Sequence, residues 1–196
     1  MRRKFNEVTD KKEIQRILSL TNIGRLATNG KDGYPYITPV NFVSYKENIY
    51  FHCAPKGKKL DNLLRDPRVC FEVDVPLSYL NLDSYPNREI CQLHQFYHCV
   101  IIRGRASIVE ESEKKVDVLT NLIAKHENTT DFKQVTDDMP GFKACKVVEV
   151  KPINITAKSD LGQKIPEEIR STMAKYFFKR NQPGDAETVK AMGYNF

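Results

Sequence analysis

The chain has 196 residues, of which 40% are hydrophobic and 29% are charged, and its formal net charge is +6. This length suits one domain with an appendage, and no apolar run approaches the length of a bilayer-spanning helix. The basic residues are scattered and no helix-turn-helix or RNA-binding string occurs, so the charge indicates a solvated surface rather than a nucleic-acid-binding protein.

The first 75 residues carry two helix signals separated by strand signals. Asp10 and Glu13 have the spacing of a capping box before an apolar stripe, which is typical of a short helix. Runs rich in β-branched and aromatic residues follow, interrupted by the turn signals NGKDG and SYKENI. A leucine stripe then ends at Pro67, and an alternating apolar–polar run comes after it. In chain order we predict a helix over 9–21, strands over 24–54, a helix over 55–66 and a strand over 68–75.

The rest of the chain begins with an irregular stretch. Residues 76–95 contain prolines, asparagines and serines, which predicts a long loop of the kind that serves as a lid or a partner contact. A strand over 97–109 and an amphipathic helix capped by Ser112 follow. Residues 143–159 form either a strand pair or one bent strand, and the tail contains a predicted helix over 165–180.

These elements together predict the fold class. Strands with short connections and helices at their ends favour a mainly β fold, an antiparallel barrel with peripheral helices. Alternating strand–helix–strand units are absent, and so are the glycine-rich phosphate-binding signatures, which argues against a Rossmann fold. We expect a barrel domain over residues 1–160 and a C-terminal helical tail over 161–196, packed on the barrel or on a partner chain.

A basic helix start is the first candidate binding feature. A predicted strand runs into the turn Pro55–Gly57, after which Lys58 and Lys59 open a helix. The turn and the helix N-terminus present free backbone N–H groups and a partial positive charge, and the lysines add full charges. An anion, and above all a phosphate, would bind well there. The alternative is a solvated helix start with exposed lysines.

The segment CQLHQFYHC, residues 91–99, contains residue types that bind zinc. Zinc sites usually combine two short ligand pairs separated by a loop, which is not the spacing here. On the predicted strand His98 and Cys99 point to opposite faces, so they cannot hold one ion together. A three-ligand site made of Cys91, His94 and His98 remains open, but the pattern favours ordinary packing and no bound metal.

Several segments in fixed order resemble one protein family. GRLATNGKDGYPYITPVNF, YFHCAPKGKKLDNLL and RVCFEVD resemble the pyridoxamine 5'-phosphate oxidase-like FMN-binding split-barrel superfamily. Together with MRRK at the start and YHCVIIRGRASIVEESEK later, they are similar to the branch related to 5-nitroimidazole-resistance proteins. The similarity runs from Met1 to about Lys158. It implies a six-stranded split barrel that forms a homodimer, with FMN bound at the interface.

The resemblance also implies roles for particular residues. The strand holding TPVN would lie along the flavin ring or ribityl chain, the segment HCA would contact the ring and phosphate ends, and the lysines after it would hold the phosphate. The implied cofactor-binding residues are Thr38, Val40, Asn41, His52, Cys53, Ala54, Lys58 and Lys59. This agrees with the anion site inferred from the helix start alone.

Three departures limit what the resemblance implies. Many superfamily members have arginine where Thr38 stands, so one phosphate or ribityl contact differs. Cys53 replaces a serine or threonine, and a thiol is a weaker hydrogen-bond donor. The tail has no tryptophan, so it lacks the substrate segment of pyridoxamine-phosphate oxidase itself, and that activity is not implied.

His52 is the candidate catalytic residue. The nitroimidazole-resistance proteins have histidine at the matching position, where a neutral imidazole can donate a hydrogen bond or relay a proton. The alternative is a histidine held by backbone partners without chemistry. The resemblance thus implies an FMN-dependent oxidoreductase acting on nitroaromatic or quinone-like small molecules, with NAD(P)H or another reduced carrier as donor.

Two other functions remain open at this stage. One is a non-catalytic flavin-binding protein that stores or senses FMN, and the other is a haem-binding relative with His52, His94 or His98 as axial ligand. We expect a cytoplasmic protein without nucleic-acid or membrane partners, because the start has no secretory signal and five irregularly spaced cysteines suit a reducing compartment.

Overall fold

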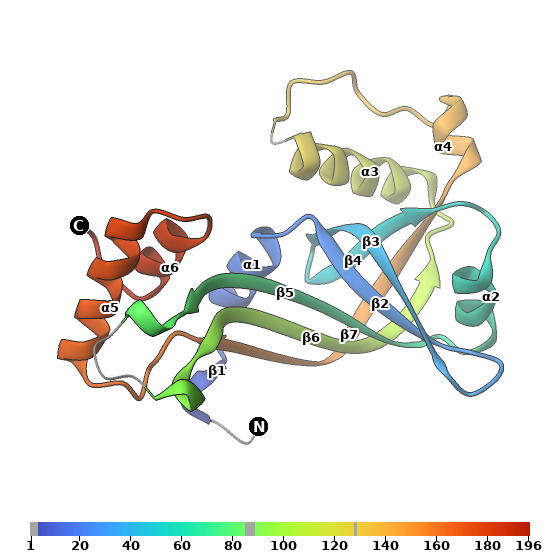
Figure 1. The fold of residues 1–196 in the computed structure, drawn as a ribbon. Coiled ribbons are helices and arrows are strands. Elements are labelled where there is room, and N and C mark those ends of the chain that lie inside the picture. The colour runs from blue at the N-terminus through green and yellow to red at the C-terminus, as the bar shows by residue number, and fades with distance from the viewer. Residues whose placement is uncertain (1–3, 85–88, 128) are drawn as a thin grey trace. The chain divides into compact units, whose positions relative to one another are not determined.

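The computed structural model describes residues 4–84, 89–127 and 129–196 (Figure 1). The strands are β1 (Glu7–Val8), β2 (Ile23–Asn29), β3 (Pro35–Tyr45), β4 (Asn48–Cys53), β5 (Arg68–Leu80), β6 (His94–Ile108) and β7 (Lys146–Asp160). The helices are α1 (Lys11–Ser19), α2 (Lys58–Arg65), α3 (Ser112–Glu127), α4 (Pro140–Ala144), α5 (Glu167–Arg180) and α6 (Asp185–Ala191). No helix among the described residues is long and apolar enough to cross a membrane.

The described strands form one sheet in the order β1-β7-β4-β3-β2-β5-β6, and β7 also pairs with β6. This last pairing closes the six longer strands into a barrel. The pairs β2–β3, β2–β5, β3–β4 and β4–β7 are all antiparallel. The predicted mainly β split barrel with peripheral helices is therefore confirmed, and residues 143–159 contribute one continuous strand rather than a pair.

By its contacts the chain divides into two compact units. The barrel unit comprises Gln15–Val73 and Val100–Ile155 and holds β2, β3, β4, α2 and α3. The tail unit comprises Met1–Ile14, Asp74–Cys99 and Thr156–Phe196 and holds α5 and α6. The predicted domain boundary at residue 160 stays a prediction.

Large apolar side chains fill the barrel unit. Leu26, Phe42, Phe51 and Phe71 are fully buried, and the rings of Phe42 and Phe71 meet edge to face at 5.0 Å. Gly24 is required beside them, because a Cβ there would lie 2.1 Å from the Phe71 ring. This core fixes β2, β3, β4 and β5 relative to one another.

The helix α3 covers the other face of β3 and β4. Val118 and Leu122 of α3 pack with Val43, Tyr50 and Val147 in a separate apolar cluster. Residue 43 therefore faces α3, whereas its neighbour Phe42 faces the barrel core, as the alternation of side chains along a strand requires. Each strand of the β3–β4 hairpin thus has two distinct faces.

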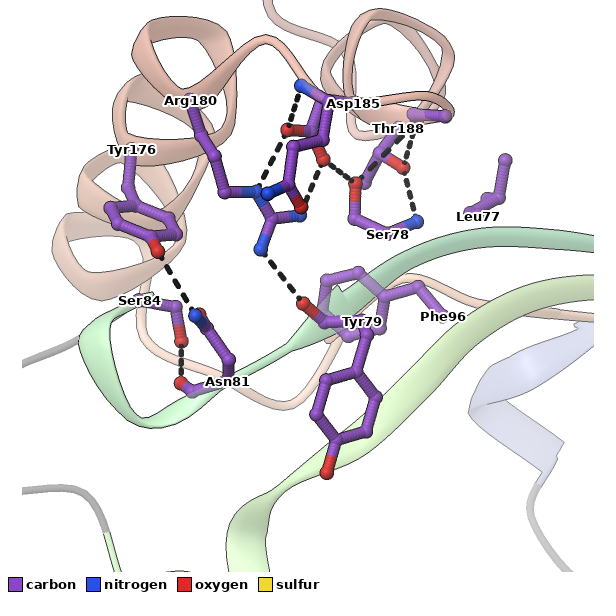
Figure 2. Close-up of polar contacts among 12 residues, drawn as sticks. Leu77, Ser78, Tyr79, Asn81, Ser84, Phe96, Tyr176, Arg180, Asp185 and Thr188 are labelled. Atoms are coloured by element: carbon purple, nitrogen blue, oxygen red, sulfur yellow. Dashed lines mark hydrogen bonds and ion pairs between the residues drawn. The ribbon is translucent and has the colours of Figure 1, made fainter.

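The tail unit has its own apolar core, to which Leu77, Leu80, Phe96 and Phe177 contribute. Polar contacts join β5 to the last two helices (Figure 2). The Ser78 backbone N–H donates to the Thr188 hydroxyl at 2.8 Å, so the two segments are joined across 110 positions of sequence.

The predicted loop over 76–95 is wrong at both ends. The strand β5 continues to Leu80, and β6 begins at His94. Leu77 and Leu80 are buried in the tail unit's core, so helices much later in the chain supply the partners that this local sequence does not reveal. Of the intervening positions, 85–88 lie outside the described residues. The sequence also did not predict the short helices α4 and α6.

Candidate functional site

The β3–β4 hairpin carries most of the residues predicted to bind a cofactor. Its register pairs Phe42 with Phe51 and Tyr45 with Asn48. Antiparallel partners point to the same face, so Phe51 faces the barrel core together with Phe42. The two-residue turn at Lys46 and Glu47 has positive φ at both positions, which is the geometry of a tight hairpin.

The strands place the predicted residues on two different faces. Thr38 and Val40 alternate with Phe42 on the core-facing side of β3, and Val40 is 6% exposed. Asn41 and His52 come directly after the Phe42–Phe51 pair, on the opposite face, and both are exposed. A ligand can therefore reach the side chains of Asn41 and His52, whereas the Val40 side chain is occupied by core packing.

The basic helix start lies on the core-facing side. Lys58 places its ammonium 4.9 Å from the centre of the Tyr36 ring, and Lys59 places its own 5.2 Å from the Phe51 ring. Tyr36 alternates with Thr38 along β3. Both lysines thus lean over the same strand face that carries Thr38.

The N-terminus of α2 has no side-chain cap. Gly57 occupies the cap position with φ 135°, a conformation that favours glycine, and it has no side chain to satisfy the first N–H groups. The helix is held from its other side, where the Asn62 amide donates to the Thr28 hydroxyl at 3.1 Å. The first turn therefore offers unpaired backbone donors next to two lysines.

The Thr38 hydroxyl is buried and has no hydrogen-bond partner among the described residues. Buried polar groups are normally paired, because an unpaired one costs free energy. An unpartnered hydroxyl on the face over which Lys58 and Lys59 lean fits a ligand that would complete its hydrogen bonding. The residues present therefore fit a bound phosphate at this place.

Cys53 ends β4 and is half-buried. Burial raises the pKa of its thiol, and the nearby Lys59 opposes that shift only in part. The thiol is therefore neutral near pH 7 and serves as a weak hydrogen-bond donor rather than as a nucleophile. Ala54, directly after it, is exposed.

Two titratable residues near this hairpin were not predicted from the sequence as candidate site residues. Lys125 of α3 donates to the Leu18 carbonyl at 3.2 Å and lies 3.5 Å from the centre of the Phe42 ring. Burial lowers the pKa of Lys125 to about 8. Its neighbour His126 has a pKa lowered by burial and then by Lys125 and His52. The only sequence signal for Lys125 and His126 is their position at the end of the predicted amphipathic helix.

The cysteine–histidine segment is used for local contacts. The Cys91 thiol donates to Glu89 at 3.3 Å, His94 Nδ1 lies 3.0 Å from the Gln92 carbonyl, and the buried His98 ring lies 2.7 Å from the Ser159 hydroxyl. Within the described residues no group of three His, Cys, Asp or Glu side chains is placed to hold a metal ion. The absence of a bound metal stays a prediction.

Comparisons with known proteins found one matching family model and several similar solved structures. A family model described as pyridoxamine 5'-phosphate oxidase matches residues 10–159. A candidate 5-nitroimidazole antibiotic resistance protein from Bacteroides thetaiotaomicron is 23% identical, with 78% of this chain and 85% of that chain covered and a TM-score of 0.66. No match was found among curated proteins.

Two further solved structures are similar. A conserved hypothetical protein from Mycobacterium tuberculosis is 22% identical, with 83% of this chain and 92% of that chain covered and a TM-score of 0.63. A flavocytochrome from Azotobacter vinelandii is 18% identical, with 85% and 75% covered and a TM-score of 0.67. At these identities the likeness shows a shared fold.

Proposed function

The chain belongs to the pyridoxamine 5'-phosphate oxidase family, and we propose that it is a flavoprotein that binds FMN on the β3–β4 hairpin. The observation that carries the proposal is the uncapped start of α2, where Lys58 and Lys59 lean over the face of the unpartnered Thr38 hydroxyl. These groups provide two positive charges, backbone N–H donors and one further hydrogen bond, all at the place where the phosphate would bind.

The other predicted residues take supporting roles in this proposal. Asn41 and His52 are exposed side by side and meet the ring or ribityl chain with their side chains, while the buried Val40 contributes its main chain. Cys53 and Ala54 lie between them and the phosphate site, at the end of β4. FMN, when bound, supplies the hydride and electron chemistry, and the protein supplies binding and electrostatics.

We further propose an oxidoreductase that reduces nitroaromatic or quinone-like small molecules with NAD(P)H or another reduced carrier as donor. The candidate 5-nitroimidazole resistance protein with the same fold supports this choice of acceptor. His52 is the proposed catalytic residue, because its exposed imidazole can hold or donate a proton at a reacting ligand. The proposed working form is a homodimer in which both chains touch each flavin.

Purification tests the proposal directly. We expect a yellow protein that releases FMN on denaturation, sediments as a dimer and oxidises NAD(P)H when a nitroimidazole or a quinone is present. Bound FMN without turnover would favour the storage or sensor function, and a haem Soret band would favour the haem-binding alternative. A protein that takes up neither FMN nor haem after reconstitution contradicts the proposed site.

Replacement of Thr38 by valine is expected to separate cofactor binding from stability. Valine removes the unpartnered hydroxyl, so the flavin-free protein should gain about 1 kcal/mol in free energy of unfolding. The affinity for FMN should fall about tenfold, the lower end of the value of a hydrogen bond to a charged group. Urea unfolding of the apo-protein and fluorescence titration with FMN measure the two effects.

Thr28→Val is the matched control for this experiment. The Thr28 hydroxyl is also buried, but it donates to the Tyr36 carbonyl at 3.2 Å and accepts from Asn62 at 3.1 Å. Its loss should therefore lower the free energy of unfolding, opposite in sign to Thr38→Val. If both variants lose stability, Thr38 is satisfied in the apo-protein and the argument from its hydroxyl is wrong.

A further inference from the structure

The barrel unit has a groove that the proposed flavin site does not use. It has a volume of about 800 Å³ and is formed by residues of β2, β5, β6 and β7 with the turn after β2. None of the eight residues proposed to bind FMN lines it. Its lining residues are Ala27, Thr28, Asn29, Gly30, Gly33, Pro35, Asp66, Arg68, Val69, Cys70, Arg103, Gly104, Ile153 and Asn154.

Small residues make this groove hollow. Ala27 of β2 is registered opposite Cys70 of β5, so two short side chains lie next to each other on the same face of the sheet. Gly104 of β6 is required for a further reason, because a Cβ there would lie 2.4 Å from the Lys151 carbonyl oxygen. The backbones of β6 and β7 therefore approach closely beside the groove, on the strand face opposite to Arg103.

The groove carries one arginine without a partner. Arg103 is exposed and makes no hydrogen bond or ion pair with any residue that the structure describes. Arg68, by contrast, is held by Asp66 through contacts of 2.9 Å and 2.7 Å, and hydrogen bonds from Arg68 keep the pKa of that carboxyl well below its usual range. The Arg68–Asp66 pair is therefore close to neutral, and the net positive charge of the groove comes from Arg103.

We propose that this groove binds a small organic anion, with its carboxylate or phosphate group on Arg103 and its apolar body against Ala27, Cys70 and Ile153. A guanidinium presents its donors in a planar fork that matches carboxylate and phosphate groups. Ile153 is 72% exposed at the groove wall, so it offers apolar surface to a ligand. The volume lies in the range of pockets that bind small molecules.

Benzoate and phenyl phosphate are suitable probes, since they combine an apolar ring with the two candidate anionic groups. Each is titrated into the isotope-labelled protein as purified, and amide shifts are followed by NMR. We expect saturable shifts at Ala27, Cys70 and Arg103, and a comparison of the two probes tells whether the site prefers a carboxylate or a phosphate. Arg103→Gln should weaken the better probe about tenfold or more.

Arg105→Gln is the control, because Arg105 is also exposed, two residues along β6, and lines not this groove but a neighbouring depression of about 410 Å³ that shares Ile153 with it. It removes the same charge, so affinity within about twofold of wild type supports a contact specific to Arg103. Ala27→Leu, which fills the groove, should abolish the shifts. Equal losses in both arginine variants, shifts elsewhere in the chain, or displacement of the probe by excess FMN would overturn the proposal.

Discussion

Replacement of Asp185 by alanine is expected to lower the free energy of unfolding by about 3–5 kcal/mol. Asp185 is fully buried and accepts hydrogen bonds from Arg180 at 2.5 Å and 2.9 Å and from the Ser78 hydroxyl at 2.5 Å (Figure 2). Its removal leaves the largely buried Arg180 without its counter-charge, and leaves the Ser78 hydroxyl only the longer contact of 3.4 Å to the Gly184 carbonyl. An uncompensated buried charge costs more than the pair contributed.

Urea unfolding measures this loss, and Glu187→Ala is the control. Glu187 lies in the first turn of the same helix, carries the same charge and is exposed, so its removal should change stability by about 0.5 kcal/mol or less. Asp185→Asn keeps the shape of the side chain and should fall between the two. A loss below about 1 kcal/mol for Asp185→Ala would mean that this network does not hold α6 on β5.

The same variant has an expected pH signature. Burial alone would raise the pKa of Asp185, but hydrogen bonds from Arg180 and Ser78 outweigh burial and hold the pKa below its ordinary value. A carboxyl with a lowered pKa stabilises the fold above the unfolded-state pKa of about 3.9, and this contribution is lost as the pH falls through the folded-state pKa. The stabilities of wild type and Asp185→Ala should therefore converge in acid.

This network also explains where sequence reasoning about the fold failed. Residues 76–80 have a proline, a serine and a tyrosine among their apolar residues, which locally indicates a loop. They form a strand because Ser78 finds Thr188 and Asp185, more than 100 positions later, and because Leu77 and Leu80 find the tail unit's core. Patterns within a short stretch of sequence predicted the helices and strands that depend on neighbouring residues. The end of β5 depends on residues more than 100 positions away, so no short stretch of sequence predicts it.

For the candidate site, the sequence predicted the uncapped helix start better than the burial of the residues on β3 and β4. The uncapped helix start followed from Pro55–Gly57 and the two lysines, whose positions relative to the helix depend only on local spacing. The separation of Thr38 and Asn41 onto opposite faces follows from strand alternation, and their different burial depends on the core beneath them. Lys125 could not be predicted, since its burial arises from packing against Phe42 and Leu18.

Joint replacement of Lys58 and Lys59 by alanine is expected to give the largest change in cofactor affinity. A charge-assisted contact to phosphate contributes about 1.5–3 kcal/mol, so FMN should bind about 10- to 100-fold more weakly. His52→Ala should weaken FMN binding less than the double lysine variant does, by about 0.5–1.5 kcal/mol for a neutral hydrogen bond. It should reduce the turnover rate more than it reduces FMN binding. The double variant is needed because either lysine can take over part of the phosphate load.

Titration of apo-protein with FMN at two salt concentrations distinguishes a local phosphate contact from general electrostatics. The control is the double variant Lys12→Ala, Lys175→Ala, which removes the same two charges from exposed positions in α1 and α5. It should bind FMN within about twofold of wild type, because neither lysine belongs to α2 and salt at 0.1 M screens exposed charges that make no direct contact with the ligand. The Lys58, Lys59 variant should also lose most of the salt dependence that wild type shows. If it binds as tightly as wild type, the phosphate lies elsewhere, and the uncapped start of α2 is a solvated helix end.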